Sequence, residues 1–219
     1  GIIDSGIDRR ELFLTTKVAT NIMREGKDTV RKSIEESLKK LKTDYLDLLL
    51  IHWPVKDCVK HTWQVMEQYV KAGKVRYLGV SNFNRHHLEA LFEYATIRPV
   101  LNQIEVHPLL SQVENIAYNR SLGIQVQAWG PFGQGDIDVI GHEVIQSLAK
   151  KYGKTPSQIV LRWIVQRDLI TIPRAKPNHF AENLEILQFA LAEEDMAQLN
   201  ALNINLRSNK DNDPETFPW

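Results

Sequence analysis

The chain alternates short apolar runs with longer amphipathic stretches. Six short runs are rich in apolar or β-branched residues, at residues 12–16, 46–51, 75–80, 100–106, 124–128 and 169–172. Between them, apolar positions recur every three to four residues, which is the period of a helix with one buried face. Buried strands that alternate with helices predict a parallel sheet covered on its faces, so the pattern indicates an α/β fold.

Helix boundaries are marked by capping and stop residues. The first clear helix begins at about Asp28, a candidate N-cap, and Val30, Ile34 and Leu38 give it one apolar face. Thr155–Pro156 opens another helix with a threonine cap followed by proline at the first helical position. Further helices are expected at residues 62–72, 86–95, 113–122, 143–152, 179–187 and 193–202. We expect one domain over residues 1–219, with an irregular tail at 207–219.

Two closures of such a sheet are compatible with the pattern: an open doubly wound sheet and a (β/α)8 barrel. No G-x-G-x-x-G follows the first apolar run, so the dinucleotide fingerprint of a doubly wound sheet is missing. In both architectures the carboxyl ends of the strands share one face, and that face carries the active site.

Composition narrows the classes of function. Lys+Arg and Asp+Glu both number 27, and this balance argues against a nucleic-acid partner. The apolar runs fall far short of the ~20 residues of a membrane span, so no membrane partner is expected. Cys58 is the single cysteine, which excludes an intramolecular disulfide. We expect a soluble, cytoplasmic protein that is a monomer or a weak homo-oligomer.

Polar side chains gather where the predicted strands end. The exits read Thr16–Lys17, His52–Trp53–Pro54, Ser81–Asn82–Phe83, Gln103 with Glu105, Trp129–Gly130–Pro131 and Pro173–Arg174. Each group also has a structural interpretation: a solvated lysine, a hydrogen-bonded core histidine, or a helix cap at Ser81–Asn82. For Glu105 and Asp47 we favour structural pairing with neighbours. The coincidence over six strands favours an active site on this rim.

Other catalytic motifs are missing from the sequence. There is no nucleophile elbow, no phosphate-binding loop of the Walker type and no zinc-binding helix motif, so no metal is expected. Cys58 has no motif around it and is expected to be inert. On the residues alone, Lys17 also permits a lyase or aldolase that uses its amine to form a Schiff base.

Six segments closely resemble the aldo-keto reductase superfamily. They are ELFLTTK (11–17), TDYLDLLLIHWP (43–54), GKVRYLGVSNF (73–83), LNQIEVHPLL (101–110), IQVQAWGPFG (124–133) and KTPSQIVLRWIVQRDLITIPR (154–174). The resemblance implies the (β/α)8 TIM barrel rather than the open sheet. It also implies NAD(P)H-dependent reduction of aldehydes or ketones, small carbonyl compounds, to alcohols without a metal.

The same resemblance assigns roles to individual residues. Lys17 and His52 match catalytic residues, and Trp53 matches an aromatic of the substrate pocket. The cofactor would be bound by Ser81, Asn82 and Gln103 at the nicotinamide carboxamide, by Trp129 stacked on the ring, by Gly130, Pro131 and Phe132 along the pyrophosphate, by Arg174 at the 2′-phosphate, by His179 where the family has a second arginine, and by Glu182 and Asn183 at the adenine.

Two departures qualify the cofactor prediction. Arg174–Ala175 stands where the family has lysine and serine, and a guanidinium can hold a phosphate with two hydrogen bonds. His179 in place of an arginine removes one cation and weakens the preference for a phosphate. We therefore expect NADPH, with NADH use also permitted.

The largest departure concerns the family's D-T-A-x-x-Y-x-N-E motif, which supplies a catalytic aspartate and tyrosine. Nothing in this chain matches it, and residues 1–7 (GIIDSGI) resemble the end of the second barrel helix. Tyr45 is no substitute, because it enters its strand from the opposite, stabilising face.

We therefore expect a barrel that lacks about its first two strands. Six strands cannot close an eight-stranded barrel, so the 219-residue piece alone is expected to be neither stable nor active. In the favoured hypothesis, Lys17 and His52 assist a tyrosine acid that is not present in this chain. The alternative hypothesis is a non-catalytic NADP-binding barrel that serves as a regulatory or interaction subunit.

Overall fold

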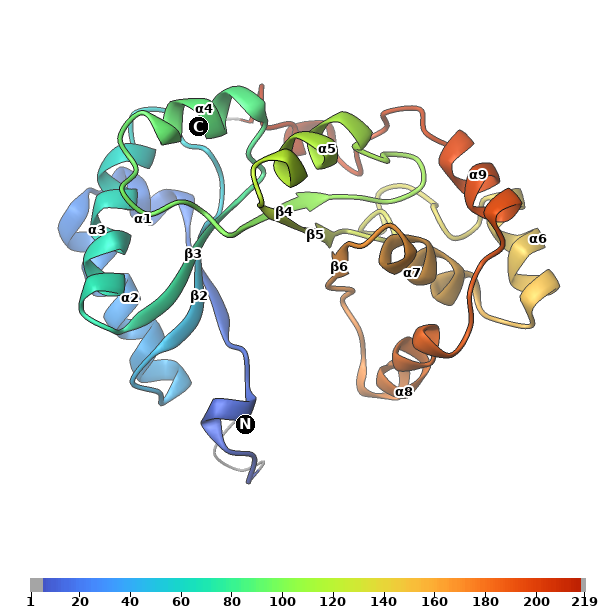
Figure 1. Cartoon of the computed structure of the whole chain (residues 1–219), viewed down its shortest axis with the longest axis horizontal. Helices are drawn as coiled ribbons and strands as arrows, with labels where there is room; N and C mark the ends of the chain where they lie inside the picture. Colours follow the sequence, from blue (N-terminus) through green and yellow to red (C-terminus); the bar gives the residue numbers. More distant parts are fainter. Residues whose placement is uncertain (1–5, 218–219) are drawn as a thin grey trace. The chain divides into compact units, whose positions relative to one another are not determined.

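The structure is a computed structural model that describes residues 6–217 (Figure 1). Its contacts divide the chain into two compact units, one ending at Asn102 and the other beginning at Gln103. The comparison of residues 1–7 with the end of a barrel helix lies mostly outside the described residues. No helix in the described part is long and apolar enough to cross a membrane.

The first unit is built on three parallel strands in chain order: β1 (Thr15–Val18), β2 (Leu46–Ile51) and β3 (Val75–Ser81). The helices are α1 (Thr20–Arg24), α2 (Lys27–Leu41), α3 (Val59–Lys71) and α4 (Arg85–Phe92), and a 3-10 turn covers Arg9–Glu11. All six residues of β2 are buried, as the unbroken apolar run predicts.

The structure corrects two predictions for this unit and adds one element. The first strand begins at Thr15 rather than at residue 12, because Phe13 is exposed and the Leu14 amide binds the Asp47 carboxylate. Asp28 is not the N-cap of α2. Gly26 occupies that position with φ 96°, which glycine tolerates, while Asp28 lies in the first turn. The five-residue α1 was not predicted, since it is too short to show a period.

The second unit contains β5 (Gln125–Trp129) and β6 (Ile170–Thr171), which pair in parallel, and most of β4 (Leu101–Glu105), which precedes β5 in the sheet. Its helices are α5 (Val113–Ser121), α6 (Glu143–Tyr152), α7 (Pro156–Gln166), α8 (Phe180–Leu184) and α9 (Glu193–Ala201). The predicted start of α7 is confirmed, since Thr155 caps it, with Pro156 at the first position.

Residues 179–187 do not form the single helix that was predicted. They divide into a 3-10 turn at Pro177–His179, the short α8, and a second 3-10 turn at Glu185–Gln188. Leu184 and Leu187 are 69% and 67% exposed, so this segment lacks the continuous buried face that would support a longer helix. Beyond α9, the described residues contain one further 3-10 turn, at Lys210–Asn212.

The core of the second unit lies on one face of β5. Val126 and Ala128 are fully buried in the same apolar cluster as Ile159 and Trp163 of α7. The alternate residues of β5, beginning with Gln125, point to the other face and are half-buried. This period of two places a row of polar and aromatic side chains opposite the core.

Candidate active site

Lys17 and His52 lie at the carboxyl ends of neighbouring strands. Lys17 is in register with Leu50, and the His52 amide donates a hydrogen bond to the carbonyl of Val18 at 3.2 Å. Because His52 follows Leu50 by two residues, its side chain leaves on the same face as Lys17. The strand-end rule therefore brings these two predicted residues together.

Burial and charge change the protonation of this pair. Burial lowers the pKa of the Lys17 ammonium. Burial, and secondly the positive charge of Lys17, lower the pKa of His52 to about 4. At neutral pH the imidazole is therefore uncharged, with one N–H donor and one acceptor nitrogen.

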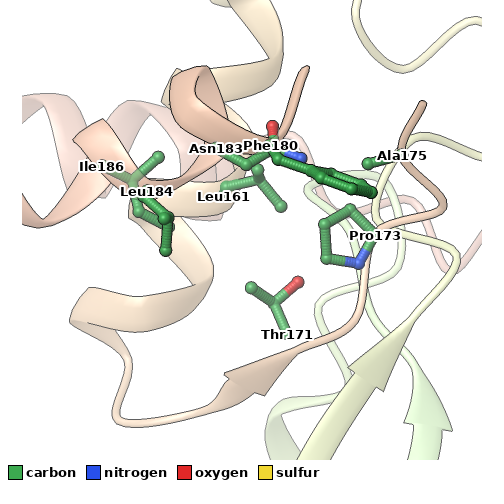
Figure 2. A pocket seen from close by; sticks show the side chains of 8 residues that line it. All are labelled: Leu161, Thr171, Pro173, Ala175, Phe180, Asn183, Leu184 and Ile186. Carbon is green, nitrogen blue, oxygen red and sulfur yellow. The ribbon is translucent and has the colours of Figure 1, made fainter. Parts of the chain in front are cut away.

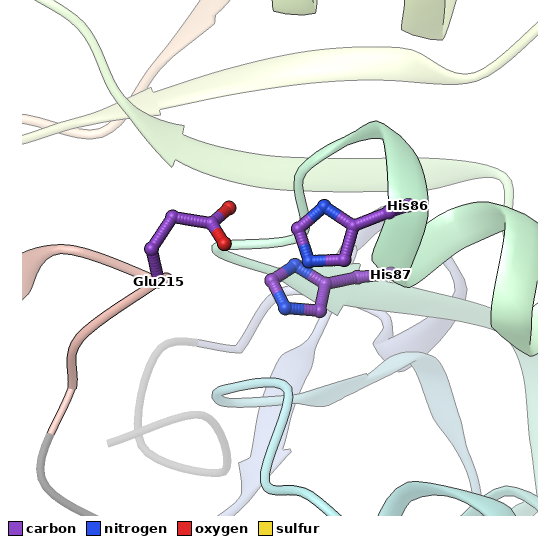
Figure 3. Close-up of side chains that lie close together, drawn as sticks. All are labelled: His86, His87 and Glu215. Atoms are coloured by element: carbon purple, nitrogen blue, oxygen red, sulfur yellow. The ribbon is translucent and has the colours of Figure 1, made fainter.

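Ser81 and Asn82 end the third strand beside His52. The Asn82 side-chain amide donates to the His52 carbonyl at 3.1 Å and to the Ser81 hydroxyl at 3.2 Å, and Asn82 has φ 63°. The interpretation of this pair as the cap of α4 is wrong, because Asn84 is the N-cap. The backbone amide of Asn84 donates to Nδ1 of His87 at 3.1 Å in the first turn of α4. The ring centres of His86 and His87 lie 3.9 Å apart there (Figure 3).

Trp53 and Tyr45 flank β2 at its two ends. Trp53 is buried, and its ring centre lies 6.4 Å from that of His52. Tyr45 precedes the strand, and its ring is sandwiched between the guanidinium groups of Arg9 and Arg76 at 3.9 and 4.2 Å. Tyr45 therefore sits at the end of the strand opposite His52, as predicted.

The two acidic residues assigned to structural pairing make such pairs. Asp47 accepts from Arg9 at 2.8 Å and from Arg76 at 2.9 Å. Glu105 lies 3.3 Å from Nε2 of His107 and accepts from the backbone amide of Ser208 at 2.8 Å. Both predictions are confirmed.

In the second unit, Gln103 and Trp129 lie on neighbouring strands. Nε2 of Gln103 donates to Oε1 of Gln127 at 2.6 Å. The carbonyl of Trp129, the last residue of β5, accepts from the amide of Val106 at 3.2 Å. Gln127 and Trp129 are two residues apart on one strand, so their side chains share a face.

A tight loop follows Trp129 and contains the predicted pyrophosphate-binding residues Gly130, Pro131 and Phe132. The Gly133 amide donates to the Gly130 carbonyl at 3.0 Å, and both glycines have positive φ. A Cβ atom on Gly133 would lie 2.6 Å from the carbonyl oxygen of Ile137, so this position admits only glycine. The positive φ angles of the two glycines and the close approach of Ile137 to Gly133 therefore require glycine in this loop.

Asn183, one of the two predicted adenine residues, lines a cavity of about 400 Å³, and Arg174 lies between two of its other lining residues, Pro173 and Ala175 (Figure 2). Its lining residues are Leu161, Thr171, Pro173, Ala175, Phe180, Asn183, Leu184 and Ile186. Arg174 is exposed and forms no ion pair with the described residues. The lining is largely apolar, with Asn183 and Thr171 as its polar side chains.

Glu182 is fixed beside this cavity by two neighbours. The Thr155 hydroxyl donates to it at 2.6 Å, and Nδ1 of His179 lies 3.1 Å from its other oxygen. These two contacts, Thr155 first, hold the pKa of Glu182 below its usual value. His179, which stands where the family has a second arginine, therefore contacts the carboxylate of Glu182.

Two residues of the site were not predicted. Gln127 lies within a strand, and the only signal for it is its spacing of two from Trp129. Thr171 lines the cavity, and its hydroxyl is buried without a hydrogen-bond partner among the described residues. The Lys17 group belongs to the first unit and the Trp129 group to the second, and their meeting around one ring stays a prediction.

Comparisons with known proteins agree with this picture. The model of the aldo/keto reductase family matches residues 3–204. A glyoxal reductase of Bacillus subtilis is 45% identical over 204 residues, which cover 93% of this chain and 72% of the relative. A deep-sea metagenome aldo-keto reductase has a TM-score of 0.89 and 37% identity, covering 94% of this chain and 76% of that one. A Gox0644 variant in complex with NADPH has a TM-score of 0.86 and 35% identity, with 97% and 78% covered.

Proposed function

Because the chain belongs to the aldo/keto reductase family, we propose that it reduces small aldehydes and ketones to alcohols with NADPH as the reductant. Family membership makes the protein an oxidoreductase that acts on carbonyl compounds, and it confirms the predicted (β/α)8 barrel fold class. The observation that carries the finer proposal is the placement of Lys17 beside a neutral His52 at the strand ends.

The described residues fit a phosphorylated dinucleotide. The cavity lined by Asn183 and Phe180 is apolar with few polar groups, as suits a planar base. Arg174, which makes no ion pair within residues 6–217, supplies a guanidinium between the lining residues Pro173 and Ala175 for a phosphate. Trp129 would stack on the nicotinamide ring, and Gln103 would bind its carboxamide. When bound, NADPH supplies the hydride that the reduction needs.

His52 orients the substrate carbonyl in this proposal. Its imidazole is uncharged at neutral pH, so one ring N–H is available to donate a hydrogen bond to the carbonyl oxygen. Such a donor stabilises the negative charge that develops on the oxygen during reduction. Trp53, buried beside the imidazole, would form one wall of the substrate pocket.

Lys17 supplies the positive charge of the site. Its ammonium is partly shielded from water, which strengthens its electrostatic effect on neighbouring groups. It would favour the anion of the tyrosine acid that the family resemblance implies, and so lower the pKa of that acid. Its task is to hold charge beside the proton donor rather than to form a bond.

The substrate class follows from the relatives. The glyoxal reductase of Bacillus subtilis shares 45% of its residues with this chain over the matched region. We therefore place 2-oxoaldehydes such as glyoxal and methylglyoxal first among the small carbonyl compounds. A flat aromatic wall such as Trp53 suits these small planar molecules.

The test is a cofactor titration followed by turnover. Quenching of tryptophan fluorescence by NADPH and NADH gives both affinities, and loss of NADPH absorbance with a panel of aldehydes gives activity. In a protein that carries the tyrosine acid as well, we expect NADPH to bind more tightly than NADH and glyoxal to be reduced. Binding of NADPH without oxidation by any aldehyde would support the non-catalytic alternative, and failure to bind would overturn the proposal.

A further inference from the structure

We propose that Asn102 is a positioning residue for His52, which it reaches through the turn at residues 81–83. Its side chain fixes the backbone of Phe83, and the fixed turn places the Asn82 amide against the His52 carbonyl. The catalytic meaning of this inference rests on the proposed function, in which His52 orients the substrate carbonyl. The family resemblance described above assigns no role to Asn102.

The side-chain amide of Asn102 pairs with the Phe83 backbone through both of its ends. Oδ1 of Asn102 accepts from the Phe83 amide at 3.4 Å, and Nδ2 donates to the Phe83 carbonyl at 2.8 Å. Both residues are fully buried. Buried backbone amides and carbonyls need hydrogen-bond partners, so this pair of bonds continues the pairing beyond Ser81, where β3 ends.

The neighbouring strands bring Asn102 within reach of the turn. β3 and β4 are adjacent in the sheet, and the Val100 amide donates to the Leu78 carbonyl at 2.9 Å. A Cβ atom on Gly79 would lie 2.7 Å from the Leu101 carbonyl oxygen, so the two backbones approach closely at the residue before Asn102. This close approach puts Asn102 next to the end of β3, where the turn begins.

The turn needs support because its backbone is unusual. Asn82 has φ 63°, in the left-handed region that costs energy for residues other than glycine, and it is buried together with Ser81. Such a conformation persists where the surrounding structure holds it in place. The bonds from Asn102 act on Phe83, the residue that directly follows the left-handed position.

The turn holds His52 from one side, and β1 holds it from the other. The Asn82 side-chain amide donates to the His52 carbonyl at 3.1 Å, and the His52 amide donates to the Val18 carbonyl at 3.2 Å. These bonds fix the backbone that carries the imidazole. If the turn were released at Phe83, the Asn82 amide would move and the first of these bonds would weaken.

The experiment is an NMR titration of the His52 imidazole in the full protein and its variants, with His52→Gln to identify its signal. Burial, with the charge of Lys17, lowers the pKa of His52 to about 4. In Asn102→Leu, which has a similar volume and makes neither hydrogen bond, we expect this pKa to rise by about one unit as water reaches the ring. If Asn102→Leu does not fold, Asn102→Ala carries the test, because it leaves room for a water at the Phe83 backbone.

Asn119→Leu is the matched control for a general loss of stability. Asn119 is also a fully buried asparagine, and its Nδ2 donates to the Asn115 carbonyl at 2.8 Å within α5. The control should lower the melting temperature about as much as Asn102→Leu does, because each variant removes buried hydrogen bonds. It should leave the pKa of His52 unchanged.

A second comparison tests the route through Asn82. Asn82→Gly keeps the left-handed backbone and removes the amide that holds the His52 carbonyl, so it should also raise the pKa of His52. Asn102→Leu added to Asn82→Gly should then produce little further shift, because both changes act on the same bond. Fully additive shifts would overturn this route.

The outcomes separate this inference from the proposed function. An unchanged pKa of His52 in folded Asn102→Leu, or an equal shift in Asn119→Leu, would overturn the positioning role. In a protein that also carries the tyrosine acid, Asn102→Leu should reduce turnover by about tenfold or more, as a displaced catalytic group does. A shifted pKa with unchanged turnover would support the positioning of His52 and overturn the catalytic role proposed for it.

Discussion

The ammonium of Lys17 lies close enough to His52 to depress the pKa of the imidazole. Burial is the larger cause, and the two together bring that pKa to about 4. The relationship arises because β1 and β2 are neighbours in register, so that consecutive strand ends deliver a cation and a neutral donor to one place. Its consequences are measurable in several ways.

Lys17→Met should raise the pKa of His52, because it removes the nearby positive charge. The pKa should stay below the ordinary value of 6.5, since burial remains. NMR titration of the imidazole gives the shift. The same variant should reduce turnover by about 10²–10⁴-fold while leaving NADPH affinity nearly unchanged. Unchanged turnover would remove the assigned role of Lys17.

Stability should fall as the pH is lowered from about 6.5 towards 4. In this window unfolded His52 binds a proton and folded His52 does not, so protonation favours the unfolded state. For a partly exposed imidazole we expect a loss of about 2 kcal/mol. Urea unfolding at several pH values measures it. His52→Gln should flatten this part of the curve, and an equally steep curve in that variant would contradict the account.

Asp47→Asn should destabilise the first unit by roughly 2–4 kcal/mol. Asp47 is only 2% exposed, and burial alone would raise its pKa. The Leu14 amide, Arg9 and Arg76 outweigh that effect and lower the pKa of Asp47. Chemical denaturation provides the measurement. The exposed pair of Asp28 and Arg31 gives the matched control, because Asp28→Asn should change stability by less than about 1 kcal/mol.

Gly133→Ala should destabilise the loop that follows Trp129 and weaken NADPH binding. The new Cβ would meet the side chain and the carbonyl oxygen of Ile137, in a backbone conformation with φ 73°. Gly135, with φ 91° and open space around it, gives the matched control. We expect Gly135→Ala to cost about 1–2 kcal/mol from backbone strain alone and Gly133→Ala clearly more. Thermal melts and cofactor titration of both variants test the difference.

Arg174→Met should reduce the affinity for NADPH by about tenfold or more while leaving that for NADH nearly unchanged. The reason is that Arg174 is exposed, makes no ion pair with the described residues, and lies between Pro173 and Ala175, which line the cavity. Lys71→Met removes an exposed cation at the end of α3 and should change neither affinity. Equal losses for both cofactors in Arg174→Met would exclude a role at the 2′-phosphate.

Sequence patterns correctly predicted the elements whose bounds follow from neighbouring residues alone. The strand at residues 46–51 is correct to the residue because every position is buried, and the helix at 143–152 because Gly153 ends it in the left-handed conformation. The start of β1 could not be predicted, since Leu14 binds to the distant Asp47. Long-range bonds of this kind leave no local period.

The candidate site likewise contains residues that the sequence predicted and one that it did not. Lys17 and His52 were found because polar residues that end apolar strands stand out in the sequence. Gln127 did not stand out, because a polar residue in a half-buried strand is common, and its contact with Gln103 joins residues 24 positions apart. Only the neighbouring strands bring these two amides together.

Tyr45 stacks between Arg9 and Arg76, and this contact stabilises the end of β2 that is remote from His52. Laboratory evolution of substrate range would therefore randomise Trp53 and the segments that follow each strand, while keeping Arg9, Tyr45 and Asp47 fixed. Libraries built that way should retain a high fraction of folded members. The residues that would set substrate range follow one end of β2, and the residues that stabilise the fold lie at its other end, with six buried residues between them.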